Sequence, residues 1–178
     1  MGDSIVPITL AGGCSWCVEA VFERLRGVVA VESGYSNGHA SAPTCETVCS
    51  GNTGHAEVVR VRFDPARLAL ADVLQVFFAT HDPTSRHRQG ADVGTQYRSG
   101  IYFSDESQRA VIARVVAEAN NELGGRLVTE VEPIANYSAA EAYHQHYFAN
   151  NPDQGYCAAV IGPKIEKFRK VFKSRLVE

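Results

Sequence analysis

The 178-residue chain has the composition of a globular protein with one hydrophobic core, since 45% of its residues are hydrophobic and 21% are charged. Seventeen Lys and Arg residues against twenty Asp and Glu residues leave a formal net charge of -3, which does not favour nucleic acid as a partner. The sequence has no apolar run of membrane-spanning length, and residues 1–10 lack the pattern of a secretory signal. We therefore expect a single domain over residues 1–178, located in the cytoplasm and without a membrane partner.

The first half of the chain predicts three strands and two helices. They are a strand at 5–10, a helix between Gly13 and Gly27, strands at 28–33 and 56–63, and an amphipathic helix at 70–81. Between them lies a Gly-, Ser- and Asn-rich stretch, 34–55, which is unusually long for a compact domain. Such a loop is usually functional or disordered.

The second half begins with another long loop, residues 82–99, and continues with the same kinds of element. The predicted elements are a strand at 100–103, a helix from about Ser104 to Gly124, a strand at 128–133, a helix from the capping box Ser138-x-x-Glu141 to about Ala149, and a last helix from Pro163. Strands and helices are mixed without repeats. We expect an α+β fold, a two-layer sandwich of the ferredoxin-like α/β roll type, with a mixed sheet, flanking helices and long functional loops.

The cysteines are the first candidates for chemistry. Their odd number, five, argues against the disulfide framework of a secreted domain. Cys14 follows a strand and a glycine pair at the start of a helix, where free N–H groups and the helix dipole favour an anion. This position predicts a lowered thiol pKa and a nucleophile, although most cysteines taken at random are buried and inert.

Two other interpretations of the cysteines stay open at this point. Cys14-x-x-Cys17 together with Cys45-x-x-x-Cys49 could supply four zinc ligands, but the stretch between the pairs is longer than the usual spacing. Cys14-x-x-Cys17 alone resembles a thioredoxin-like redox motif, without the usual proline and glycine between the cysteines.

An acidic residue is the second candidate. The strand phase of Glu57 places its carboxyl among Val59, Val61 and Phe63, where desolvation would raise its pKa toward that of a general acid. The alternative is a glutamate at a strand end that reaches water. Further along, residues 89–99 gather hydrogen-bonding groups before a strand, in what could also be an ordinary surface turn.

Four ordered blocks resemble the A-type methionine sulfoxide reductases. They are Gly-Gly-Cys14-Ser-Trp-Cys-Val-Glu, Val48-Cys-Ser-Gly-Asn-Thr-Gly-His-Ala-Glu57, Gly94-Thr-Gln-Tyr-Arg-Ser99, and Tyr143-His-Gln with Asn151-Pro. The resemblance extends from about Ala11 to Pro163. It implies a peptide-methionine (S)-S-oxide reductase that repairs oxidised proteins under oxidative stress, working without a cofactor or metal and as a monomer.

The resemblance also implies roles for individual residues. The Cys14 thiolate would attack the sulfoxide sulfur while Glu57 delivers a proton to the oxygen. Tyr97 would donate a hydrogen bond to that oxygen, Asp92 would hold the polar side of the site, and Trp16 would pack against the substrate methyl.

The resemblance further implies how the enzyme is regenerated. Cys14 is left as a sulfenic acid, which condenses with a second thiol to form an intramolecular disulfide. By similarity that thiol is Cys157, carried by a flexible segment around 150–162, and thioredoxin then reduces the disulfide. Cys17 is the rival resolving thiol, but two cysteines three residues apart at the start of a helix need local unwinding to bond well.

Three positions depart from the family pattern. Ser15 and Cys45 replace a usual Phe and a common Tyr of the substrate pocket, and Ala91 replaces a common Asn. The first two changes predict an enlarged pocket that accepts bulkier small S-sulfoxides besides free and protein-bound methionine sulfoxide. The alternative is a catalytically weakened relative that binds sulfoxides or senses redox state.

Overall fold

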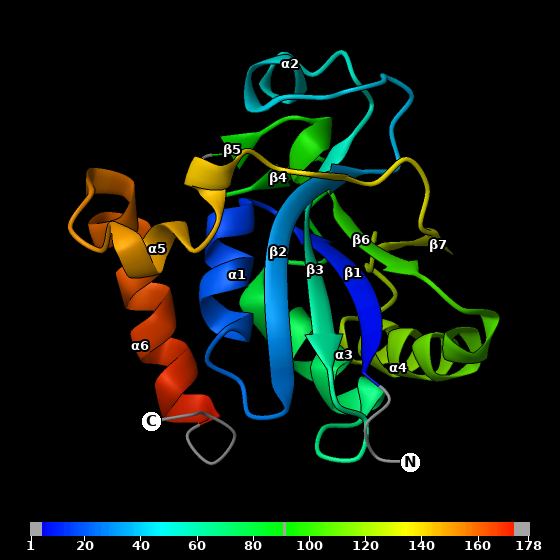
Figure 1. Cartoon of the computed structure of the whole chain (residues 1–178). Helices are drawn as coiled ribbons and strands as arrows, with labels where there is room; N and C mark the ends of the chain where they lie inside the picture. The colour runs from blue at the N-terminus through cyan, green and yellow to red at the C-terminus, as the bar shows by residue number, and fades with distance from the viewer. Residues whose placement is uncertain (1–4, 91, 173–178) are drawn as a thin grey trace.

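The computed structural model describes residues 5–90 and 92–172, and its centre is a six-stranded sheet with the order β7-β6-β1-β3-β2-β8 (Figure 1). Its strands are β1 (Val6–Gly12), β2 (Val28–Ser36), β3 (Ala56–Phe63), β6 (Ser99–Phe103), β7 (Glu130–Pro133) and β8 (Ser138–Ala139). All neighbouring pairs are antiparallel except β6 and β7, which run parallel. The sheet is mixed, as predicted.

Helices cover one face of this sheet. The helices are α1 (Ser15–Phe22), α2 (Cys45–Cys49), α3 (Leu70–Thr80), α4 (Arg109–Glu122), α5 (Tyr147–Asn150) and α6 (Gly162–Val171). The main core forms where the inward side chains of β1, β3 and β6 meet apolar residues of α1, α3, α4 and α6, among them the fully buried Phe22 and Phe77. The hydrophobic periodicity of these helices therefore identified their buried faces correctly.

The opposite face of the sheet carries only a small apolar cluster. Ala11, Ala56, Val58 and Tyr102 are buried there, and side chains of the segment after β7 pack against them. The two-layer α+β sandwich is thus confirmed. In the described part of the chain, no helix has the length and apolar character needed to cross a membrane.

The antiparallel pairing places several chain segments at one end of the sheet. Because β1 and β2 both run antiparallel to β3, both end where β3 begins, and Gly12 at the end of β1 pairs with Ser99 at the start of β6. The connections 37–55 and 82–98 therefore lie at this same end. The first contains α2, and the second contains a hairpin of β4 (Arg88–Gln89) and β5 (Asp92–Val93) and a 3-10 turn at Thr95–Tyr97.

The predicted helix from Ser138 to about Ala149 is wrong. Ser138 instead pairs with Tyr35 as part of β8, and a short 3-10 turn, Ala142–His144, follows. His146 then adopts a left-handed conformation with φ 54°, which separates this turn from α5. The Glu141 side chain accepts hydrogen bonds from Tyr35 Oη and Cys45 N, so tertiary contacts replace the capping box that the sequence suggested.

Candidate active site

Cys14 is the N-cap residue of α1, between β1 and the helix. It is reached through Gly13, whose φ of 91° favours glycine and whose missing side chain leaves room for Gln89. The Cys14 carbonyl accepts from the N–H groups of Cys17 and Val18. The thiol is half-buried, at the end of the sheet where the loops converge.

Glu57, the second residue of β3, lies next to this helix start. Its Oε1 accepts a hydrogen bond of 3.1 Å from Ser15 N. Burial raises the pKa of the Glu57 carboxyl to about 7, and the negative charge of Asp92 adds to the rise, although the Ser15 N–H opposes it. The strand phase thus predicted its environment correctly, and the carboxyl can hold a proton near neutral pH.

Cys14 and Cys17 are two thiols joined by a hydrogen bond. The hydrogen bond with Cys17, burial and the charge of Glu57 all raise the pKa of Cys14, while the hydrogen bond from Cys14 lowers the pKa of Cys17 to about 7. The expectation that the helix start alone lowers the pKa of Cys14 is therefore wrong. The first ionisation therefore belongs to the pair of thiols and not to Cys14 alone.

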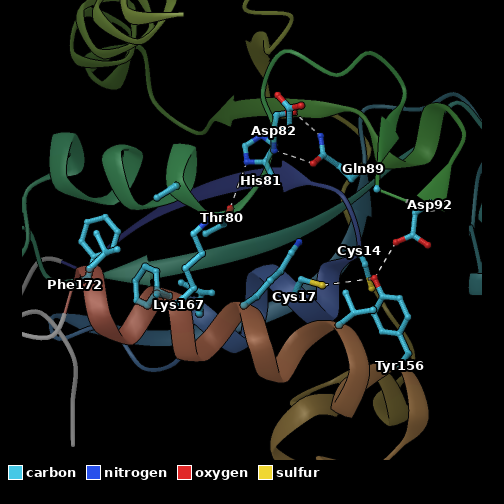
Figure 2. A pocket seen from close by; sticks show the side chains of 17 residues that line it. Cys14, Cys17, Thr80, His81, Asp82, Gln89, Asp92, Tyr156, Lys167 and Phe172 are labelled. Carbon is cyan, nitrogen blue, oxygen red and sulfur yellow. Dashed lines mark hydrogen bonds between the residues drawn. The ribbon is translucent and has the colours of Figure 1, made fainter.

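A chain of polar contacts extends from this pair to Asp92. Tyr156 Oη lies 3.7 Å from Cys17 Sγ and donates a hydrogen bond of 2.9 Å to Asp92 Oδ2 (Figure 2). The chain joins α1, β5 and the segment before α6, which are distant in the sequence. Asp92 is therefore held at the site by a residue that the sequence analysis did not single out.

A pocket of about 260 Å³ opens beside Cys14. It is lined by Cys14, Ser15, Trp16, Tyr35, Cys45, Cys49, Glu57, Asp92, Tyr97, His144 and Tyr156. All the predicted catalytic and substrate-binding residues except Cys157 therefore surround one small cavity. Ala91, the remaining departure from the family pattern, lies outside the described residues.

Trp16 forms one wall of this pocket and is fixed by two contacts. Its ring stacks on Tyr147 with centroids 3.8 Å apart, and its Nε1 donates a hydrogen bond of 3.0 Å to His144 Nδ1. Because Nδ1 accepts and burial lowers the pKa of His144, the neutral ring carries its proton on Nε2. That buried Nε2 has no partner within the described residues, and His144 lines the pocket.

Tyr97 and Tyr35 bring two phenol groups to the pocket. Burial raises the pKa of both, so each remains a hydrogen-bond donor at neutral pH. Tyr35 Oη already donates to Glu141, 2.8 Å away. Tyr97 Oη has no such donor bond among the described contacts, so it is the phenol better placed to serve an oxygen in the pocket.

Arg98 stabilises the turn that carries Tyr97. Its guanidinium donates to the carbonyls of Asn37 and Gly54, and its Nε forms a 2.9 Å ion pair with Glu130. The side chain thereby connects the long 37–55 connection to the turn before β6. Arg98 therefore makes internal contacts with two other chain segments, and the surface-turn interpretation is wrong for this residue.

Cys157 lies apart from the pocket. It begins the π-helical turn Cys157–Ile161 and is 0% exposed, packed in the main core. Burial raises the pKa of its thiol. A bond between Cys157 and Cys14 would therefore require this turn to open.

A larger cavity of about 530 Å³ lies on the other side of Cys14, between α3 and α6 (Figure 2). It shares Cys14, Asp92 and Tyr156 with the smaller pocket and continues along Val160 and Phe168 of the C-terminal segment. Cys14 thus faces two cavities.

Metal coordination receives no support from the side-chain arrangement. Across residues 5–90 and 92–172, no group of three or more His, Cys, Asp or Glu side chains could hold a metal ion. Cys14 is the N-cap of α1 and Cys17 lies in that helix, whereas Cys45 and Cys49 lie on α2 with their Sγ atoms 4.0 Å apart. The two cysteine pairs therefore do not form the four-ligand zinc site that their sequence pattern left open.

Sequence reasoning missed Tyr35, His144 and Tyr156 as site residues. Tyr35 lies in a strand and Tyr156 next to Cys157, and neither position has a local pattern that indicates a pocket wall. Both residues reach the site only through strand pairing and the packing of the C-terminal segment. His144 stood in a block that resembled the family, which was its only available signal.

Comparison with known proteins agrees with this geometry. The family model for peptide methionine sulfoxide reductase matches residues 6–176. The chain is 52% identical over 168 residues to the peptide methionine sulfoxide reductase MsrA of Thermus thermophilus, covering 94% of this chain and 96% of that protein. It is 51% identical to the MsrA of Deinococcus radiodurans, covering 93% of this chain and 82% of that protein.

Solved structures give the same result. Methionine sulfoxide reductase A of Corynebacterium diphtheriae matches with a TM-score of 0.82 and 33% identity, over 89% of this chain and 81% of that one. Reduced Mxr1 of Saccharomyces cerevisiae matches with a TM-score of 0.80 and 35% identity, over 86% and 89%. Mxr1 in complex with Trx2 matches with a TM-score of 0.56 and 26% identity, over 80% and 84%. With residues 6–176 matched by the family model and relatives about 50% identical over more than nine-tenths of its length, the chain belongs to the peptide methionine sulfoxide reductase family.

Proposed function

We propose that this oxidoreductase reduces the S epimer of methionine sulfoxide to methionine, with Cys14 as the nucleophile and thioredoxin as the final reductant. The observation that carries the proposal is the meeting of Cys14 with Glu57, whose pKa is raised to about 7, in one small pocket. A thiol that can ionise and an acid that can hold a proton are the two groups that this reaction requires.

The first step follows from these two groups. The Cys14 thiolate attacks the sulfoxide sulfur, Glu57 gives its proton to the sulfoxide oxygen, and Tyr97 donates a hydrogen bond as charge grows there. The hydroxyl then moves from the substrate sulfur to the Cys14 sulfur as the new sulfur–sulfur bond breaks, so methionine leaves and Cys14 becomes a sulfenic acid. Trp16, fixed by Tyr147 and His144, supplies an apolar wall for the substrate methyl.

The second step removes the oxygen from Cys14. Cys157 condenses with the sulfenic acid, releases water and leaves a disulfide that thioredoxin reduces by exchange. Family membership and the thioredoxin complex of the similar Mxr1 support this route. The buried position of Cys157 requires the Cys157–Ile161 turn to unfold locally, which fits the flexible segment predicted there.

Turnover of the separated epimers tests the proposal. With thioredoxin, thioredoxin reductase and NADPH, the S epimer of methionine sulfoxide should give methionine and the R epimer should give none. Equal turnover of both epimers, or no turnover of either, would refute it. An S-configured aryl methyl sulfoxide in the same assay measures how wide the pocket is at Ser15 and Cys45.

A further inference from the structure

Cys45 and Cys49 form a second cysteine pair that the mechanism above does not use. They lie at the two ends of α2, with their Sγ atoms 4.0 Å apart. In an α-helix, residues four apart have Cα atoms about 6 Å from each other, which lies within the usual Cα separation of a disulfide. The Cβ atoms of such a pair are about 5–6 Å apart, more than a disulfide allows, so α2 must adjust locally for the two sulfurs to bond.

Both thiols line the pocket that holds Cys14 and Glu57. Cys45 is half-buried and Cys49 is exposed, whereas Cys17 is 4% exposed and Cys157 is 0% exposed. Cys17 contacts Cys14 from the core side, whereas Cys45 and Cys49 are the two of these four thiols that line the smaller pocket. Once methionine has left, these two thiols share the pocket of about 260 Å³ with the sulfenic acid on Cys14.

We propose that Cys45 and Cys49 are a second resolving pair, which reduces oxidised Cys14 from the substrate side of the pocket. The inference depends on the proposed function, because the sulfenic acid arises from sulfoxide reduction.

Two thiol reactions accomplish this reduction. One thiol of the pair attacks the Cys14 sulfenic sulfur, so that a Cys14 mixed disulfide forms and the hydroxyl group leaves as water with the thiol proton. The other thiol, after losing its proton to solvent, attacks the sulfur of its neighbour in the mixed disulfide. This second reaction forms the Cys45–Cys49 disulfide and releases Cys14 as a thiolate. The two electrons given to the sulfoxide have then come from the α2 pair.

The first reaction needs a base, because burial and the neighbouring Cys49 raise the pKa of Cys45 to about 11 and the charge of Glu57 adds to the rise. Glu57 lines the same pocket and has given up its proton in the first step, so its carboxylate is the base that can take the thiol proton and pass it to the leaving hydroxyl. The helix has only five residues and is followed by Gly51, with φ 80° and open space around it. A short helix at a glycine turn can adjust locally without disturbing the sheet.

Counting methionine formed without any reductant tests the proposal. The variant Cys17→Ala with Cys157→Ala removes both buried thiols, and alanine avoids leaving an unpaired hydroxyl in the core. Given excess S epimer of methionine sulfoxide in the absence of oxygen, it should form two equivalents of methionine per chain. The first comes from Cys14, and the second follows after the α2 pair has regenerated it.

Two matched variants provide the comparison. Adding Cys45→Ser or Cys49→Ser to the same background should reduce the yield to one equivalent and trap a Cys14 mixed disulfide with the remaining thiol, or a Cys14 sulfenic acid. The number of methionine equivalents is measured after the reaction has stopped, so a slower first step in a changed pocket does not alter this number. Tenfold dilution should also leave it unchanged, because the reaction lies within one chain.

One equivalent of methionine in the Cys17→Ala, Cys157→Ala variant would overturn the proposal, as would a second equivalent that disappears on dilution. No methionine from the unaltered chain would instead refute the proposed function. If the double variant does not fold, alkylation and mass spectrometry of the unaltered chain after turnover without reductant decide the matter. A Cys45–Cys49 disulfide there supports the proposal, and full alkylation of both residues overturns it.

Discussion

The two sides of Cys14 are built differently. On the helix side, Cys17, Tyr156 and Cys157 are packed between α1 and the C-terminal segment, where cysteine thiols are almost fully buried. On the loop side, α2 and the 3-10 turn Ala142–His144 form a wall from connections, where Cys49 is exposed. The buried side can tune thiol pKa values through fixed contacts, whereas the loop side can vary in shape and chemistry at little cost to the core.

Cys14, which belongs to both sides, gives the largest predicted effect. Cys14→Ser should lower sulfoxide reduction by more than about 10³-fold, because a serine hydroxyl does not ionise near neutral pH and no other thiol occupies its position. The measurement is kcat/KM for the S epimer. Near-normal turnover in a correctly folded variant would mean that the nucleophile lies elsewhere, with the α2 pair as the first place to search.

Glu57, which lines the smaller pocket beside Cys14, should give the next effect. Glu57→Gln should lower kcat/KM by about 10²–10⁴-fold, since an amide can bind the sulfoxide oxygen but cannot protonate it. The raised pKa of about 7 means that the acid form is lost as pH rises through 7, so the parent rate should fall on the alkaline side. The variant should lose this alkaline limb and keep the rise that comes from ionisation of the thiol pair. A variant profile with the same alkaline fall would contradict the role.

On the loop side, the prediction concerns pocket shape. Ser15→Phe combined with Cys45→Tyr should restore two bulky walls and shift preference from an S-configured aryl methyl sulfoxide toward methionine sulfoxide. Filling a pocket of this kind changes selectivity by about 10–200-fold. The ratio of the two kcat/KM values, in the parent and in the double variant, measures the shift. An unmoved ratio would show that neither residue sets the pocket width.

On the helix side, the predicted effect is the smallest. Tyr156→Phe removes the hydroxyl that contacts Cys17 Sγ and Asp92, and that contact lowers the pKa of Cys17. The first ionisation of the thiol pair should move upward, and alkylation of Cys14 at pH 7 should slow by about 2–10-fold, the value of one hydrogen bond. Tyr143→Phe is the matched control, because Tyr143 is 63% exposed. Equal effects in both variants would remove Tyr156 from the thiol network.

The sequence predicted the main strands and helices on which the site is built. The alternation in 56–63 gave β3 and the phase of Glu57, and the glycine pair before Cys14 marked the start of α1. Apolar periodicity gave α3, α4 and α6 to within a few residues. These features are local, because one strand face or one helix stripe must be buried whatever lies opposite.

The structure around Ser138 and the pKa of Cys14 did not follow from local sequence patterns. The capping box at Ser138 was a valid helix signal, but strand pairing with Tyr35 and the bonds from Tyr35 and Cys45 to Glu141 took its place. The pKa of Cys14 was expected to fall at a helix start, but burial and the Cys17 contact raise it. In both cases, partners distant in the sequence or a neighbouring titrating group outweighed a local effect worth about 1 kcal/mol.

The sequence by itself determined the residue types available for chemistry, the elements that carry Cys14 and Glu57 and, through ordered motifs, the family. Only the tertiary structure decided which of the five thiols face the substrate and which lie in the core. It also brought Tyr156, His144 and Tyr35 to the pocket. The physical reason is that burial, pKa and thiol separation depend on contacts between distant segments, such as Cys17 and Tyr156, which are 139 residues apart. No local periodicity encodes those contacts.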